Sequence, residues 1–167
     1  MPTGESGTIY GKPGEFWPDF TYIANDQKRR DIAHGEFFTV GDIGYVDDEG
    51  FVYLSDRAND MVISGGVNIY PAEIEGCLHN LDGVEDVAVF GTPDADMGEA
   101  LAADLELRDG AQVTEDDVRA FVPDNLAAYK VPKVVVFEER LPREDTGKLF
   151  KRRLKERYWK DGARISG

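Results

Sequence analysis

The stretch LPREDTGKLFKRRL, residues 141 to 154, places a lysine directly after a glycine in a polar turn. A lysine in such a turn could contact a phosphate or a carboxylate, because its compact ammonium group stands on a long, flexible stem. A P-loop does not fit, since that motif needs an earlier glycine and a Ser or Thr after the lysine. In this sequence Pro142 and Arg143 stand where the earlier glycine would have to be, and Leu149 stands where the Ser or Thr would follow Lys148.

Taken alone, this stretch leaves two interpretations of Lys148 open. It could project its ammonium group into a neighbouring cleft, or it could be a surface lysine at the start of a helix. The run KLFKRRLKERYWK that begins with it holds seven of the 19 basic residues and one acid. This run is either the solvated face of a C-terminal helix or a patch that faces an anion.

Two further stretches carry residues that could contact a ligand. Asp42 follows a glycine at the end of a strand-like run, where a short acid can accept hydrogen bonds from a diol. It could equally be a turn aspartate that bonds its own backbone. Arg57 lies between acids and could be a surface ion-pair partner, and the Ser64, Gly65 and Gly66 loop either allows close backbone approach to a ligand or is a plain turn.

Other chemistry has no pattern in this sequence. Neither His34 nor His79 has other metal-ligating residues around it, and Cys77 has no evident His or Asp partner. The sequence therefore predicts no metal site, no Ser-His-Asp triad and no hydrolase carboxylate pair. Cys77 is expected to pack in the core near the apolar face of a helix.

Bulk composition limits the classes of function. The 167 residues carry a net charge of -14, which argues against general nucleic-acid binding. A single cysteine excludes an internal disulfide and is consistent with a reducing compartment. The first residues lack the pattern of a signal peptide, and no apolar stretch is long enough to span a membrane. We therefore expect a cytoplasmic protein.

The pattern of elements predicts an α+β fold. Short strands are expected at 36–40 and 51–55, joined by GDIGYVDDEG with a hairpin turn at its DDEG end. Pro71 should begin a helix that Asp82 and Gly83 end, and Thr114 with Asp117 should cap a helix to about residue 126. Further strands are expected at 61–64, 84–90, 99–107 and 133–138, with a last helix at 148–159.

These elements form a small mixed domain of the order β-α-β-β-α-β-α at residues 59–167. The first 58 residues are rich in Gly, Pro and aromatic residues and offer little core material. We interpret them as a short, incomplete β-rich tail of a larger N-terminal domain.

The order and spacing of these motifs resemble the C-terminal part of the adenylate-forming acyl-CoA synthetase superfamily. That superfamily also holds peptide-synthetase adenylation domains and beetle luciferase. GDIGYVDDEGFVYLSDRANDMVISGGVNIYPAEIE resembles its Gly-Asp motif, its hinge motif and the following glycine loop. YKVPKVVVFEERLPREDTGKLFKRRL resembles its terminal motif, and the resemblance covers residues 5 to about 157.

The resemblance implies an acid–CoA ligase with two half-reactions. ATP, with Mg²⁺, and a carboxylic acid give an acyl-adenylate and pyrophosphate, and the thiol of CoA then displaces AMP. A small C-terminal lid rotates between the two half-reactions, so residues 59–167 would be this mobile lid. ATP and Mg²⁺ would be bound mainly by the N-terminal domain, which this chain lacks for the most part.

The resemblance also assigns roles to single residues. Asp42 matches the aspartate that binds the ribose hydroxyls of ATP, and Arg57 matches an arginine that contacts the nucleotide. Lys148 matches the lysine that acts in adenylation, where its positive charge would offset negative charge at the α-phosphate. The loop of the CoA tunnel is matched by Ser64, Gly65 and Gly66.

Three positions depart from the family pattern. Asn59 falls at the hinge, where the family commonly has Lys or Asp, so any charge at the hinge is lost. Val40 stands directly before the Gly-Asp pair, where Thr is usual, and Pro123 is unusual in its helix. The departure at Val40 leaves the assignment of Asp42 in place.

The family's phosphate loop and most of the acyl pocket are not in this chain, so the chain alone is expected to be inactive. The carboxylic acid cannot be read from it. Two alternatives stay open. The chain could be a stand-alone lid or binding module that docks to a separate large domain or carrier protein, or part of a luciferase-like oxidase.

Overall fold

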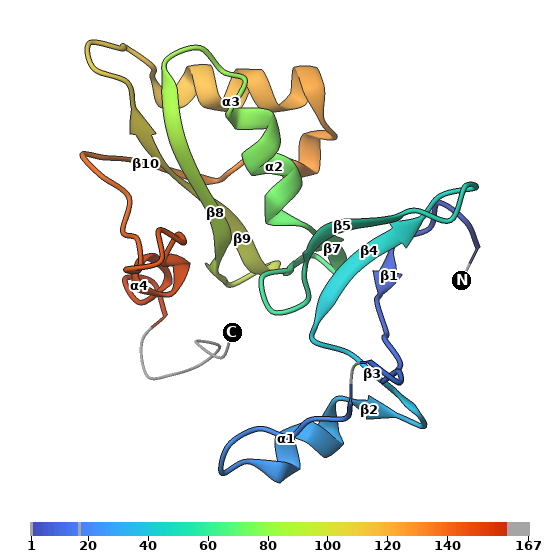
Figure 1. Ribbon diagram of the computed structural model, residues 1–167. Helices are drawn as coiled ribbons and strands as arrows, with labels where there is room; N and C mark the ends of the chain where they lie inside the picture. The colour runs from blue at the N-terminus through green and yellow to red at the C-terminus, as the bar shows by residue number, and fades with distance from the viewer. Residues whose placement is uncertain (1, 17, 160–167) are drawn as a thin grey trace. The chain divides into compact units, whose positions relative to one another are not determined.

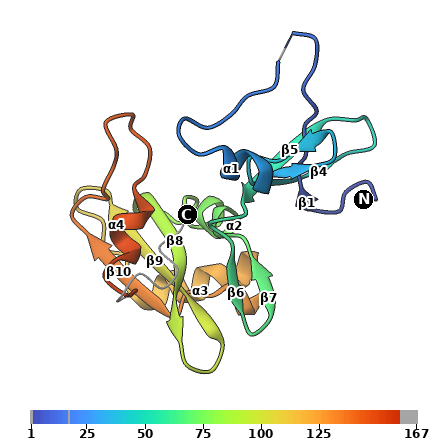
Figure 2. The ribbon, with the colours of Figure 1, turned by 90° about the horizontal axis from the view of Figure 1, so that it is seen from below.

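The computed structural model describes residues 2–16 and 18–159. The chain divides into two compact units, Met1–Ala58 and Asn59–Gly167. In Figures 1 and 2 the first unit is coloured blue to teal, and the second, a larger mixed unit, runs from green to red. No helix among the described residues is long and apolar enough to cross a membrane.

The first unit consists of short strands and one helix. Its antiparallel sheet has the order β1-β4-β5, and β2 and β3 form a separate two-stranded ribbon. The elements are β1 Gly7–Thr8, α1 Asp26–Asp31, β2 Ala33–His34, β3 Phe37–Phe38, β4 Asp42–Val46 and β5 Val52–Arg57.

The predicted hairpin turn is confirmed, but the strand that pairs across it is β4 and not the run at 36–40. The Asp47 carboxylate accepts hydrogen bonds from the N–H groups of Glu49 and Phe51, which closes the turn. The strand β4 was not predicted because it contains a glycine, a residue that is uncommon inside strands. At Gly44 a Cβ atom would lie 2.1 Å from the carbonyl oxygen of Tyr53, so only glycine allows this close approach of strands.

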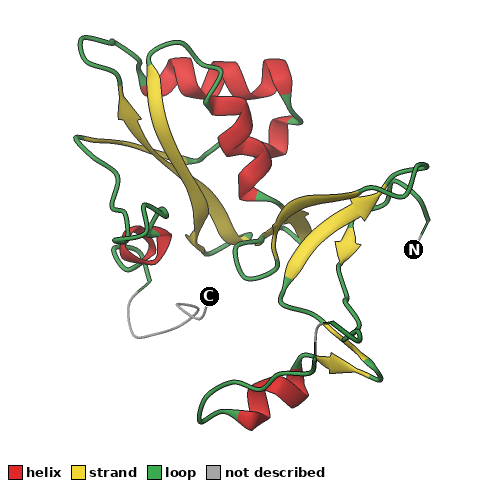
Figure 3. Cartoon of the chain, viewed as in Figure 1, coloured by secondary structure: helices red, strands yellow, loops and turns green. Residues whose placement is uncertain are grey.

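The second unit is a five-stranded mixed sheet with helices on both faces (Figure 3). The long strand β9 pairs with β8 along one edge and with β10 and β6 along the other. The elements are β6 Val62–Ser64, β7 Val67–Ile69, α2 Pro71–Leu78, β8 Val84–Asp94, β9 Gly98–Leu107, α3 Glu115–Asn125, the 3₁₀-helix η1 Ala128–Lys130, β10 Val134–Glu138 and α4 Lys151–Lys155.

Alternation of side chains along β8 separates two hydrophobic cores. In β8, Val87 and Val89 face a core shared with α2 and α3, whereas Ala88 and Phe90 face a second core. Leu154 of α4 packs in the second core, so α4 covers the face opposite to α2 and α3. Because side chains of a strand point alternately to the two faces, an apolar run like this one indicates a strand buried on both sides.

The predicted starts of α2 and α3 are confirmed. Pro71 occupies the first turn of α2. Thr114 and Asp117 form a capping box, in which the hydroxyl of Thr114 accepts from Asp117 N and the Asp117 carboxylate accepts from Thr114 N. Pro123 lies in the last turn of α3, which ends two residues later. The α+β class is confirmed, with α2 ending earlier than expected, at Leu78.

Two expectations about this unit were wrong in detail. The predicted order lacked β7, which returns from the tight turn after β6. The last helix is short, since α4 covers only Lys151–Lys155 of the predicted 148–159. Residues 148 to 150 cannot be helical because they form the second arm of a hairpin, in which Leu149 pairs with Arg143.

Candidate functional site

Lys148 lies exposed on the second arm of a tight hairpin. The hairpin is closed by backbone hydrogen bonds from Glu144 N to Lys148 O and from Phe150 N to Pro142 O, both 2.8 Å. Its turn ends at Gly147, which has φ +83°. The ammonium group of Lys148 is therefore presented to solvent from a defined backbone, and it has no ion-pair partner among the described residues.

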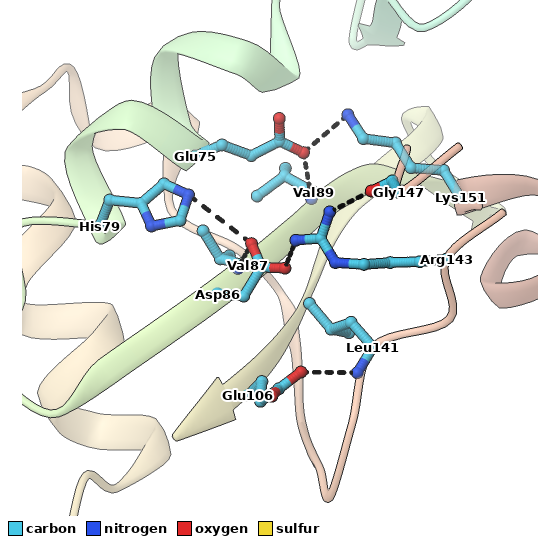
Figure 4. Close-up of polar contacts among 10 residues, drawn as sticks. All are labelled: Glu75, His79, Asp86, Val87, Val89, Glu106, Leu141, Arg143, Gly147 and Lys151. Carbon is cyan, nitrogen blue, oxygen red and sulfur yellow. Dashed lines mark hydrogen bonds and ion pairs between the residues drawn. The ribbon is translucent and has the colours of Figure 1, made fainter. Parts of the chain in front are cut away.

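The hairpin segment is attached to the rest of its unit at three points, two on the sheet and one on α2 (Figure 4). Before it, Leu141 N donates to the Glu106 carboxylate at 2.9 Å. Within it, the Arg143 guanidinium binds the Asp86 carboxylate on β8. After it, the Lys151 ammonium lies 2.6 Å from the Glu75 carboxylate.

Glu75 is itself fixed, because the same carboxylate oxygen accepts from Val89 N at 2.7 Å. The Asp86 carboxylate likewise accepts from Val87 N at 2.9 Å and lies 3.8 Å from Nε2 of His79 (Figure 4). The partners of Arg143 and Lys151 are thus held by the backbone of β8, the strand on which the hairpin rests.

The basic run after Lys148 is paired mainly with acids of its own unit. Lys155 lies 3.3 Å from Asp60, and Arg157 binds the carboxylates of Asp104 and Glu138. The interpretation of the run as a solvated face holds in part, because Arg152 and Arg157 are exposed although they pair with acids, whereas Lys151 and Lys155 are partly buried. Arg153 is exposed, and Lys160 lies outside the described residues.

Asp104 is a buried acid in the middle of an apolar strand. It is fully buried on the α4 face, and its Oδ1 has no hydrogen-bond partner among the described atoms. Burial raises the pKa of Asp104 to about 6; Arg157 opposes this rise and Glu138 adds to it. A carboxylate within the run LAADLEL was a signal that sequence analysis could have used, because a buried charge needs a partner.

Asp104 should make stability depend on pH. The pKa of Asp104 is higher in the folded chain than in the unfolded one, so the folded chain binds the proton more tightly. The stabilisation that this proton gives to the folded chain is fully present below about pH 4 and is lost as pH rises through 6. In Asp104→Asn this loss cannot occur. The free energy of unfolding of the variant relative to the unmodified chain should therefore rise by about 1–3 kcal/mol between pH 4 and 7.

Urea unfolding followed by circular dichroism at pH 4 to 7 measures this difference. The exposed turn residue Asp109 gives the matched control, and Asp109→Asn should follow the unmodified chain at each pH. Parallel curves for Asp104→Asn and the unmodified chain would contradict the prediction.

The glycine loop predicted to line a tunnel forms the turn between β6 and β7. Gly65 and Gly66 have φ of +56° and +80°, as a two-residue hairpin turn requires. Gly65 N donates to Met97 O at 2.9 Å, which places the loop against the turn between β8 and β9.

The turn beside the glycine loop is itself rigid. The Asp94 carboxylate accepts from Lys133 Nζ at 2.5 Å and from the N–H groups of Asp96 and Met97 at 3.1 Å. Lys133 and these two N–H groups lower the pKa of Asp94 to about 2. The glycine loop therefore rests on a turn whose carboxylate stays ionised.

The glycine loop and the anchor of the Lys148 hairpin lie at opposite ends of β8. The hairpin is held at Asp86 and the loop rests beside Asp94, and eight residues of strand span roughly 25 Å. The structure therefore does not bring Ser64, Gly65 and Gly66 together with Lys148.

Asp42 and Arg57 are brought together in the first unit. They are directly paired residues of β4 and β5, and Nε of Arg57 lies 3.7 Å from the Asp42 carboxylate. Arg57 remains 61% exposed and Asp42 27% exposed, so both groups are open to further contacts. Sequence analysis had considered only neighbouring acids as partners of Arg57.

Asn59 is exposed in the turn at 58–60 and is the first residue of the second unit. Cys77 is partly buried on α2, where burial raises the pKa of its thiol. Within the parts of the chain that the structure describes, no group of three or more His, Cys, Asp or Glu could hold a metal ion.

Comparison with known proteins identifies this architecture. Residues 73–148 match the AMP-binding enzyme C-terminal domain, and the match ends at Lys148. Through these residues the chain belongs to the AMP-binding enzyme C-terminal domain family. It is 44% identical over 137 residues to a long-chain-fatty-acid–CoA ligase of Mycobacterium tuberculosis, which covers 82% of this chain and 27% of the ligase.

Solved structures of this family share the fold. ATP-bound MatB from Rhodopseudomonas palustris matches with a TM-score of 0.85 at 35% identity, over 95% of this chain and 31% of that one. The o-succinylbenzoate CoA synthetase of Bacillus subtilis, in complex with the acyl-adenylate OSB-AMP, matches with a TM-score of 0.83 at 33% identity, over 93% and 31%. This AMP-binding family member thus spans less than a third of the length of these relatives.

Proposed function

We propose that this chain is the C-terminal part of an ATP-dependent, AMP-forming acid–CoA ligase. The observation that carries the proposal is the domain match that ends at Lys148, on an exposed hairpin, among relatives named as CoA ligases. In the first half-reaction a carboxylate oxygen attacks the α-phosphate of ATP and pyrophosphate leaves. In the second, the CoA thiol attacks the acyl carbon, and AMP leaves with the electron pair of the broken C–O bond.

In this proposal Lys148 acts in the first half-reaction only. Its ammonium group would offset the negative charge that develops where the carboxylate meets the α-phosphate. Asp42 would accept hydrogen bonds from the ribose hydroxyls, and Arg57 would add a contact to the nucleotide. Support comes from the exposure of Lys148 and from the half-open Asp42–Arg57 pair.

The second half-reaction would use the glycine loop. Gly65 and Gly66 carry no side chain, and Ser64 only a small one, so the loop can border a narrow thiol channel. Because the loop and the Lys148 hairpin lie at opposite ends of β8, a lid that rotates about Asn59 would present them in turn. This geometry supports the proposal that residues 59–167 form the mobile lid.

The first unit fits the proposed role as the tail of a larger N-terminal domain. Phe51, Val52 and Leu54 expose between 56% and 67% of their surface on one short strand and the turn before it. Exposed apolar groups next to each other commonly mark a surface that packs against another partner. ATP, with Mg²⁺, and the carboxylic acid would be bound mainly by that domain, and a cytoplasmic location is part of the proposal.

The proposal is tested by comparing this chain with a chimera. In the chimera, residues 1–167 replace the matching C-terminal part of the Mycobacterium tuberculosis ligase, and a long-chain fatty acid is the substrate. The chain alone should give pyrophosphate exchange at background, whereas the chimera should form the thioester. Exchange by the chain alone would contradict its role as a part, and a folded but inactive chimera would favour a binding module.

A substitution in the glycine loop should slow the second half-reaction selectively. In Gly65→Ala the new Cβ would lie 2.9 Å from Sδ of Met97 at a φ of +56°. Strain of about 1 kcal/mol or more should shift the loop and lower thioester formation from supplied acyl-adenylate about tenfold, with less effect on adenylation.

The control for this substitution is Gly110→Ala, at a turn with φ +80° and open space around the new Cβ. It imposes similar backbone strain away from the loop and should leave both half-reactions unchanged. An equal loss of both half-reactions in Gly65→Ala would argue against a role in the thiol channel.

A further inference from the structure

We propose that Arg143 is a positioning residue that holds the Lys148 hairpin in the orientation needed for adenylation. The proposal rests on the proposed function of Lys148. Arg143 does not contact the nucleotide in this account, and it acts through the backbone that carries Lys148.

The guanidinium of Arg143 joins the turn of the hairpin to the sheet (Figure 4). One end, Nη1, donates to the carbonyl oxygen of Gly147 at 2.6 Å. The other end, Nη2, binds the Asp86 carboxylate on β8. Because the planar guanidinium fixes both donors in one fork, the turn and the strand are held at a set separation.

The contact at Gly147 acts directly on Lys148. The carbonyl group of Gly147 and the N–H group of Lys148 belong to one rigid peptide plane. Holding that oxygen fixes the orientation of the plane and therefore the position of the Cα atom from which the Lys148 side chain leaves the backbone.

Other anchors cannot replace this contact. The Glu106 bond holds Leu141, before the hairpin, and the Glu75 ion pair holds Lys151, after it. Residues 144–148 are all exposed, so the turn that leads to Lys148 has little apolar packing to hold it. Among the described side chains outside the turn, Arg143 is the one that reaches Gly147.

The anchor on the sheet is rigid, whereas Arg143 itself is half exposed. The side chain of Asp86 is 15% exposed and accepts from Val87 N, and the side chain of Arg143 is 47% exposed. An ion pair with this exposure contributes little to stability. Its loss should therefore displace the hairpin while leaving the rest of the fold in place.

Hydrogen exchange in the 167-residue chain tests the clamp without reference to any reaction. In Arg143→Ala, the amides of residues 144–150 should exchange faster, and those of β8 and α2 should be unchanged. Arg153→Ala is the matched control, because Arg153 is an exposed arginine of the same segment without an ion-pair partner among the described residues. Unchanged exchange at 144–150 in Arg143→Ala would overturn the clamp.

Kinetics of the chimera test the positioning role. Arg143→Ala should lower kcat for adenylation about tenfold to a hundredfold, as expected when a reacting group is displaced by about 1 Å. Thioester formation from supplied acyl-adenylate should be retained. Arg143→Lys, which can keep the contact to Asp86 but lacks the fork, should recover part of the lost rate, and Asp86→Asn should show a smaller loss in the same direction.

A double-mutant cycle separates positioning from general damage. If Arg143 acts through Lys148, then adding Arg143→Ala to Lys148→Ala should lower the rate no further. If the loss of rate in the double variant equals the product of the losses in the two single variants, the positioning role is overturned while the role of Lys148 stays intact. A chimera in which Lys148→Ala has no effect would overturn the proposed function, and this inference with it, even if hydrogen exchange shows the clamp.

Discussion

Lys148→Ala in the chimera should lower the rate of adenylation about 10²–10³-fold, because one preorganised charge at a developing anion contributes that much. Lys148 stands exposed on its hairpin and has no ion-pair partner among the described residues, so its removal should leave the fold unchanged. Pyrophosphate release with ATP and a long-chain fatty acid measures the first half-reaction. Thioester formation from supplied acyl-adenylate measures the second, which should be largely retained.

The comparison for Lys148→Ala is Lys12→Ala, at an exposed lysine that lies 2.6 Å from Glu36 in the first unit. This control should leave both half-reactions unchanged. If Lys148→Ala slows both half-reactions equally, the lysine does not act specifically in adenylation.

Phe90→Ala should lower the free energy of unfolding of the second unit by about 3–5 kcal/mol. Phe90 is fully buried on the α4 face of the sheet, where it packs with Leu141 and Leu154. Its ring also lies 6.0 Å from that of Tyr158. Removing it leaves a cavity under the segment that carries the Lys148 hairpin, so the loss includes both apolar burial and packing.

Urea unfolding followed by circular dichroism measures the effect of Phe90→Ala. Phe137→Ala is the matched control, because Phe137 lies on a strand of the same sheet but is 38% exposed. Phe137→Ala should lower the free energy of unfolding by less than half as much, since it removes less buried apolar surface. Equal losses in the two variants would show that the core under α4 is not tightly packed.

Local patterns in the sequence determined the starts of α2 and α3 and the DDEG turn. Pro71 and the pair Thr114 and Asp117 act on neighbouring residues, so their effects follow from short-range geometry. The ordered motifs up to Lys148 also determined the family, which the comparisons confirmed. The roles of Asp42, Arg57 and the glycine loop remain predictions.

Tertiary structure alone decided what holds the proposed catalytic lysine. Arg143 and Asp86 are 57 residues apart, and Arg157 and Asp104 are 53 apart. Their pairing depends on the register of β8, β9 and β10 and on which face of the sheet α4 covers. Composition and spacing determine neither the register of the strands nor the face that α4 covers. A register shift of one residue would turn each of these carboxylates to the other face of the sheet. The sequence therefore identified Lys148, whereas the fold determined how its hairpin is held.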